Sequence, residues 1–160
     1  MAVEFRELKP HDAPALQAVY ATVPAYYDLF GGLNPEEAHK ALTESPGVGD
    51  SHHAWGVYDQ GELVGHLDFL LGYPEPTTAY LGLLLIRGDR HARGLGRQAF
   101  EQWLAWVMAG PFERVRLGIV EGNEPAVAFW SRVGCRPIGE RKSITINERP
   151  VWVQIWEFRF

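Results

Sequence analysis

Glycine and arginine residues cluster in the middle of the chain in a pattern that could bind phosphate. Gly94 and Gly96 stand close together, and Arg90, Arg93 and Arg97 surround them. Glycine has no Cβ, so its amide can approach a large anion, and each arginine adds positive charge. Because solvated arginines in an ordinary surface loop would have the same composition, the elements on either side must decide.

Those flanking residues predict a strand and a helix. Leu81–Ile86 is an almost unbroken aliphatic run, which predicts a strand buried on both faces. Arg87–Gly96 is basic and punctuated by glycine, which predicts a loop. From Arg97, apolar residues recur at helical spacing as far as Val107. The first N–H groups of a helix lack intrahelical acceptors and lie at the positive end of its dipole, so this arrangement favours phosphate binding.

A dinucleotide-binding loop is an alternative explanation of the same glycines. Gly94–Ala99 matches the pattern G-x-G-x-x-A, and Glu121 ends the next predicted strand, where an acid could bind ribose. That motif needs its first glycine directly after the strand, whereas seven residues separate Ile86 from Gly94. It also belongs to a repeated βαβ array, and the sequence shows one convincing βαβ unit. The dinucleotide alternative is therefore the weaker one.

Two motifs resemble those of a known family. His91–Gly96, HARGLG, resembles the Gln/Arg-x-x-Gly-x-Gly/Ala signature of the GCN5-related N-acetyltransferase (GNAT) superfamily, with His91 where Gln or Arg is usual. In that family the loop and the following helix hold the pyrophosphate of acetyl-coenzyme A. Asn123–Cys135, NEPAVAFWSRVGC, is similar to the family's Asn-x-x-Ala segment and its Phe-Tyr-x-x-x-Gly-Phe helix. The resemblance implies acetyl-coenzyme A (acetyl-CoA) as cofactor, bound by Leu84, Leu85, Ile86, His91, Ala92, Arg93, Gly94, Leu95, Gly96, Arg97, Asn123, Ala126, Phe129 and Trp130.

The resemblance also implies how the thioester would be activated. The family polarises its carbonyl with a backbone N–H near the end of the central strand, which here means Leu84, Leu85 or Ile86. The family's leaving thiolate often takes a proton from a tyrosine in the second-motif helix, and Trp130 stands at that catalytic position. An indole cannot deliver a proton at neutral pH, so we favour a packing role for it. The proton could instead come from water or from Tyr26, Tyr27 or Tyr73, or the thiolate could leave without an acid.

Acetyl transfer to an amine also needs a base for the ammonium, and three residues are candidates. Glu121 follows the second parallel strand, beside the place where the two parallel strands would separate. His66 and Asp68 stand two apart on one predicted strand and therefore share a face. A solvated polar residue at a strand end or edge explains each of them equally simply. The predicted catalytic residues are Glu121, Asp68 and Trp130.

The acceptor-binding residues are predicted from an aromatic segment near the N-terminus. Tyr26–Gly32 falls where the family's variable first loop covers the acceptor, and Asp28 could pair with a cation. A hydrophobic cluster that packs the first helices together would explain the same segment. The predicted substrate-binding residues are Tyr26, Tyr27, Asp28, Phe30, His66, Asp68 and Tyr73.

The order of elements predicts one domain, residues 1–160, of the α/β (α+β) class. We expect a mixed, mostly antiparallel central sheet with one parallel βαβ unit and helices on both faces, which is similar to the family's acyl-CoA N-acyltransferase fold. Val23–Gly32 is predicted to be a loop. The other strands are predicted at Val3–Leu8, His53–Tyr58, Glu62–Leu71, Val115–Ile119, Ser143–Ile146 and Val151–Phe158, with helices through Val19, from Asn34 to before Ser45, and from Asn123 to Val133.

Composition limits the class of protein. The formal net charge of −5 argues against general nucleic-acid binding, and no apolar run is long enough to span a membrane. The single cysteine, Cys135, excludes an intrachain disulfide and suits a reducing compartment, so we expect a cytoplasmic protein. The histidines lack the spacing of metal ligands, so no metal is expected.

The sequence therefore predicts an N-acetyltransferase that moves an acetyl group from acetyl-CoA to a primary amine of a small molecule or peptide. The alternative is a non-catalytic domain that binds or senses acyl-CoA, which the missing tyrosine would suit. The aromatic closing hairpin would also suit a homodimer interface.

Overall fold

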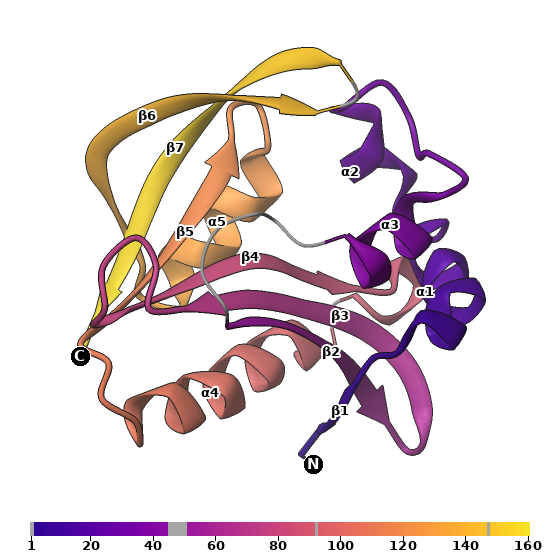
Figure 1. Ribbon diagram of the computed structural model, residues 1–160, viewed down its shortest axis with the longest axis horizontal. Helices are drawn as coiled ribbons and strands as arrows, with labels where there is room; N and C mark the ends of the chain where they lie inside the picture. The colour runs from indigo at the N-terminus through magenta and orange to yellow at the C-terminus, as the bar shows by residue number, and fades with distance from the viewer. Residues whose placement is uncertain (1, 45–50, 92, 147) are drawn as a thin grey trace.

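The computed structural model describes residues 2–44, 51–91, 93–146 and 148–160. In these residues, seven strands form one mixed sheet in the order β1-β2-β3-β4-β5-β7-β6 (Figure 1). Neighbouring strands are antiparallel except β4 and β5, which are parallel, so the predicted fold class is confirmed. The strands are β1 (Glu4–Glu7), β2 (His52–Asp59), β3 (Glu62–Leu71), β4 (Thr78–Ile86), β5 (Arg114–Val120), β6 (Arg136–Ile146) and β7 (Arg149–Arg159).

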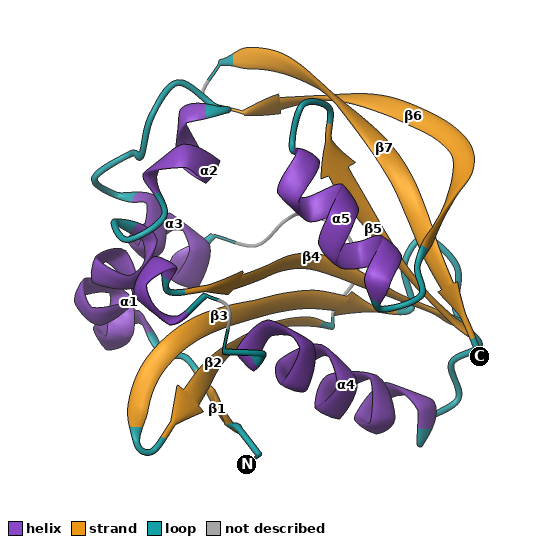
Figure 2. Ribbon diagram, turned by 180° about the vertical axis from the view of Figure 1, so that it is seen from behind, coloured by secondary structure: helices purple, strands orange, loops and turns teal. Residues whose placement is uncertain are grey.

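Helices cover both faces of the sheet (Figure 2). On one face, α4 (Leu95–Met108) and α5 (Glu124–Arg132) pack against the main apolar core. On the other face, α1 (Ala13–Tyr20), α2 (Pro24–Asp28) and α3 (Glu37–Thr43) enclose a second apolar cluster. Two short 3-10 helices, η1 (Pro10–Asp12) and η2 (Gly88–Arg90), lie in the connections. The site described below lies where the two apolar clusters meet along β4.

Several boundaries differ from the sequence prediction, including the following three. The segment predicted as a loop at Val23–Gly32 contains the one-turn helix α2, which begins at Pro24 because proline presets a helical φ at that position. Helix α4 begins at Leu95 rather than Arg97, since Gly94 itself is the N-cap. Strand β6 begins at Arg136, well before the predicted Ser143. Its exposed, polar first half gives no alternating pattern, and only its pairing with β7 makes it a strand.

The residues described include no helix that is both long enough and apolar enough to cross a membrane. Cys135 is a free, fully buried thiol. Burial raises its pKa to about 12, despite the opposing effect of Arg136. The thiol therefore stays protonated at neutral pH and serves as a small apolar core residue.

Candidate active site

The two parallel strands separate part-way along their length. β4 and β5 pair only from Thr78 opposite Arg114 to Leu81 opposite Leu117. Beyond that point β4 pairs with β3 alone, and β5 with β7 alone. The separation starts at a β-bulge, because Asp68 lies opposite Leu83 while Phe69 lies opposite Leu81, which leaves Gly82 as the extra residue.

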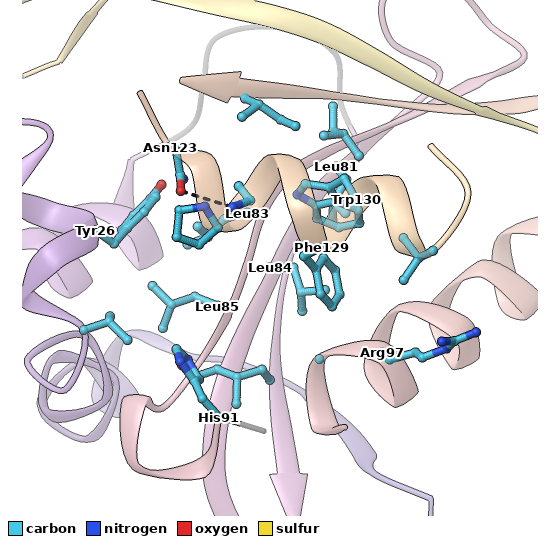
Figure 3. A pocket seen from close by; sticks show the side chains of 18 of the residues that line it. Tyr26, Leu81, Leu83, Leu84, Leu85, His91, Arg97, Asn123, Phe129 and Trp130 are labelled. Carbon is cyan, nitrogen blue, oxygen red and sulfur yellow. Dashed lines mark hydrogen bonds between the residues drawn. The ribbon is translucent and has the colours of Figure 1, made fainter. Parts of the chain in front are cut away.

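A cavity of about 560 Å³ fills the resulting gap (Figure 3), a volume in the usual range for small-molecule sites. Its wall is mostly apolar and comes from β4, β5, α2, α5, the Arg87–Gly94 loop and the start of α4. It includes these predicted cofactor residues: Leu84, Leu85, Ile86, His91, Gly94, Leu95, Gly96, Arg97, Asn123, Ala126, Phe129 and Trp130. Arg93 is exposed and does not line the cavity, and Ala92 lies outside the described residues.

One end of the cavity is the N-terminus of α4. Gly94 is the N-cap in a left-handed conformation, with φ of 74°, and having no side chain it cannot cap the helix. The first amides of this helix are therefore left to a ligand. Arg90 and Arg97 also line this end, but each has a carboxylate partner, Glu62 at 2.8 Å and Glu101 at 2.6 Å. The main-chain N–H groups are therefore more available to an anion than the two paired arginine side chains.

His91 ties the loop to the end of β4. Its Nε2 lies 2.8 Å from the carbonyl oxygen of Ile86. A carbonyl can only accept, so Nε2 carries a proton and donates it there. The ring therefore holds the loop in place, and its Nδ1 is the atom left for any contact with a ligand.

Two amides of β4 point into the gap. Arg87 N–H donates to Val64 O at 2.7 Å, toward β3. Successive N–H groups along a strand point to opposite sides, so those of Ile86 and Leu84 face away from β3 and into the gap. Leu85 N–H points toward β3 by the same rule, and the Leu85 side chain is buried in the second apolar cluster. Of the three amides predicted to polarise a carbonyl, Leu84 and Ile86 have the required direction.

The second motif forms the opposite wall. Asn123 caps α5, since its Oδ1 accepts a hydrogen bond from Ala126 N at 3.2 Å. Trp130 is buried and packs edge-on against Phe100 and Phe129, with ring centroids 5.1 and 4.8 Å apart. Its contacts support the packing role rather than the catalytic one.

The predicted acceptor segment divides between cavity and core. Tyr26 lines the cavity, and burial, helped by Glu37, raises the pKa of its hydroxyl to about 12. Tyr27 and Phe30 are buried in the second apolar cluster, and Tyr26 packs on both of them. Asp28 is exposed. The segment therefore forms a hydrophobic cluster whose core residues hold Tyr26 against the cavity, and acceptor binding by Tyr26 stays a prediction.

Asp68 is the centre of a chain of ionisable groups beside the bulge. Its Oδ1 lies 2.8 Å from His52 Nε2, and its Oδ2 lies 3.2 Å from His66 Nε2 without a well-aligned hydrogen bond. His66 is 1% exposed, and its Nδ1 lies 2.7 Å from Tyr20 Oη. Burial raises the pKa of Tyr20, so its hydroxyl keeps its proton at neutral pH and shares a hydrogen bond with His66 Nδ1.

These linked side chains approach the cavity wall at Gly82. A Cβ built on Gly82, which lines the cavity, would lie 3.6 Å from Asp68 Oδ1. The sequence prediction included Asp68 and His66 but missed Tyr20 and His52. Only the pairing of β2 with β3 brings His52 to Asp68, and only the packing of α1 brings Tyr20 to His66.

Two other predicted residues lie away from the cavity wall. Glu121 follows β5 as expected, but its carboxylate pairs with Arg141 at 2.7 and 3.1 Å. Tyr73 packs against Tyr80, with ring centroids 5.6 Å apart. Glu121 and Tyr73, like Asp68 and His66, are not among the cavity-lining residues, whereas Gly82 and Gly118, which the sequence prediction missed, are. Among the described residues, no cluster of His, Cys, Asp and Glu could hold a metal ion.

A family model and the similar solved structures all point to acetyltransferases. The family model described as Acetyltransferase (GNAT) family matches residues 18–135. The crystal structure of an acetyltransferase from Thermus thermophilus is 29% identical, with a TM-score of 0.79, over 100% of this chain and 98% of that one.

Two more distant structures share the fold. A probable acetyltransferase from Staphylococcus epidermidis is 14% identical, with a TM-score of 0.74, over 98% of each chain. An acetyltransferase from Salmonella typhimurium that modifies the N-terminal serine of ribosomal protein L7/L12 is 17% identical, with a TM-score of 0.80, over 100% of this chain and 96% of that one.

Proposed function

The chain belongs to the acetyltransferase (GNAT) family, and on that premise we propose that it moves an acetyl group from acetyl-CoA to a primary amine of a small molecule or peptide by direct attack in a ternary complex. The observation that supports this most is the gap between β4 and β5. It is apolar, it opens at the N-terminus of α4, and it presents the amides of Leu84 and Ile86.

The residues present fit acetyl-CoA. The amides at the start of α4 would hold its pyrophosphate, and the apolar walls of β4, β5 and α5 would hold its uncharged arm. The group supplies an acetyl thioester, which an amine can attack. Leu84 and Ile86 N–H would stabilise the negative charge that develops on the carbonyl oxygen. Phe129, which lies beside Gly96, would exclude water from the arm.

We assign Asp68 the role of base. An amine similar to that of lysine has a pKa of about 10, so it arrives as an ammonium ion and must lose a proton before or during attack. Asp68 lies beside Gly82, His52 forms a hydrogen bond with its Oδ1, and His66 Nε2 lies 3.2 Å from its Oδ2. Glu121 is the weaker choice because Arg141 already neutralises it outside the cavity.

The proposal is tested by thiol release. The protein is incubated with acetyl-CoA and a panel of amines that includes diamines, amino acids and a peptide with N-terminal serine, the last because the related Salmonella protein modifies such a terminus. Release that requires an amine supports the enzyme. Calorimetric binding of acetyl-CoA without release from any amine would instead support the acyl-CoA-binding alternative.

The base is tested by a matched pair of variants. Asp68→Asn should lower kcat by roughly 10²–10⁴-fold, the usual effect of removing a general base. Glu121→Gln, which also removes one carboxylate, should stay within about threefold of the parent. The opposite ranking would transfer the role to Glu121.

A further inference from the structure

We propose that Tyr80 stabilises the departing thiolate, with its phenol O–H donating a hydrogen bond to the sulfur as the C–S bond breaks. The inference rests on the proposed function and deepens it. The leaving thiolate would otherwise lack a hydrogen-bond donor, because Trp130 stands where the family often has a tyrosine. That indole is buried against Phe100 and Phe129 and is committed to packing.

Tyr80 stands at the closed end of the gap between the strands. It pairs with Arg116 on β5, one residue before the last β4–β5 pair, which is Leu81 with Leu117. Its Oη lies 3.1 Å from the position that a Cβ would take on Gly118. Gly118 lines the cavity directly after the strands part. The hydroxyl therefore lies against Gly118, a cavity-lining residue without a side chain, although Tyr80 itself is not among the residues that line the cavity.

No side chain fits at residue 118, and its absence leaves room for this hydroxyl. A Cβ there would lie 2.5 Å from Val153 Cγ1 as well as 3.1 Å from Tyr80 Oη. Any side chain at residue 118 would therefore clash with β7 and push the phenol aside. Glycine weakens a strand interior, and its presence there often marks a close approach by another group.

The Tyr80 hydroxyl is available and protonated. The ring is held by Tyr73 at 5.6 Å between centroids, with Lys142 Nζ 5.4 Å from the Tyr80 centroid. None of the described residues forms a hydrogen bond with Tyr80 Oη. Burial, with a smaller effect of Tyr73, raises the Tyr80 pKa to about 12. At neutral pH the group is therefore a donor.

Asp68 and Tyr80 flank the place where the reaction would occur. Asp68 lies beside Gly82 on the β3 side, and the Tyr80 hydroxyl lies beside Gly118 on the β5 side. The amine nitrogen forms a bond to the carbonyl carbon, its proton passes to Asp68 and then to water, and the C–S bond breaks. The sulfur leaves as a thiolate that accepts the Tyr80 hydrogen bond. Tyr80 keeps its proton because its pKa exceeds that of a thiol, about 8.5, and the sulfur is protonated later by water.

The test compares Tyr80→Phe with Tyr73→Phe. Each variant removes one hydroxyl from the same aromatic pair and keeps the ring, so folding is preserved in both. Loss of one main oxyanion donor costs about 10²–10³ in rate, and sulfur is a weaker acceptor than oxygen. Tyr80→Phe should therefore slow single-turnover thiol release about 10- to 100-fold, with the Kd for acetyl-CoA unchanged. Tyr73→Phe should match the parent.

A second measurement separates leaving-group stabilisation from a structural effect. The selenium analogue of acetyl-CoA has a more acidic leaving group, which needs less help to depart. The deficit of Tyr80→Phe should therefore shrink with this donor, whereas a variant with a distorted site would lose the same factor with both donors.

The results of these assays show separately whether the role of Tyr80 fails or whether acetyl transfer itself fails. An active parent with an equally active Tyr80→Phe variant, or with a deficit that is the same for sulfur and selenium, overturns the role of Tyr80 alone. A parent that binds acetyl-CoA and releases no thiol with any amine overturns the proposed function and this inference together.

Discussion

Two glycines at the start of α4, Gly94 and Gly96, should change the stability of the protein in opposite directions when each is replaced by alanine. Gly94 has φ of 74°, and a Cβ built there would meet nothing within 4 Å. Gly96 has an ordinary helical φ, and its Cβ would lie 3.4 Å from Phe129 Cε1, an ordinary van der Waals contact. Space is therefore available at both positions, but the left-handed backbone is unfavourable to alanine at only one.

The magnitudes follow from backbone preference. A left-handed conformation costs a residue with Cβ about 1–2 kcal/mol, so Gly94→Ala should lower Tm by about 2–8 °C at ~2–4 °C per kcal/mol for a chain of this size. Alanine is better than glycine inside a helix by about 0.5–1 kcal/mol, so Gly96→Ala should raise Tm by about 1–4 °C. Thermal unfolding without ligand measures both changes.

Coenzyme A binding gives the second measurement. Relief of the strain in Gly94→Ala would turn the α4 amides, so calorimetry should show affinity weakened about tenfold, or about 1.4 kcal/mol. Gly96→Ala should stay within about threefold, since its methyl group points to Phe129 and leaves the amides in place. Gly94→Asn is the control, because asparagine tolerates the left-handed region better than alanine although it is larger. An asparagine variant that is less stable than the alanine variant would show that bulk, not backbone conformation, decides, and would refute this reasoning.

The remaining predictions concern the second motif and the thiol. Asn123→Ala removes the α5 cap and should cost about 1 kcal/mol, or ~2–4 °C in Tm, while Asn123→Asp, which keeps the acceptor, should lose much less; equal losses would mean that the cap contributes little. Cys135 needs pH near its raised pKa of about 12 to ionise, so iodoacetamide at pH 8 should leave the folded protein unmodified and alkylate it promptly in guanidinium; fast alkylation of the native chain would contradict its burial.

Local pattern alone predicted the end of the site that we propose to bind phosphate. Consecutive residues build it: an aliphatic strand, a glycine-rich loop and a helix with apolar spacing, so no long-range contact is needed to predict them. The Asn123 cap was predictable for the same reason, since its acceptor and donor lie three residues apart. The aromatic segment around Tyr26 was only half predictable, because one residue pattern suits both a cavity wall and a core.

The contacts of the proposed acid–base groups were decided by tertiary structure. His52, Asp68 and Tyr20 come from different elements, and their contacts depend on strand register and on how α1 crosses the sheet. Glu121 illustrates the reverse: its position was predicted correctly, but its partner Arg141 lies on a strand whose first half carries no sequence signal. Tyr80 has an ordinary place in an apolar strand. Only the pairing of β4 with β5 and the missing side chain at Gly118 bring its hydroxyl beside the cavity wall, because side-chain reach across a sheet depends on pairing that no local pattern encodes.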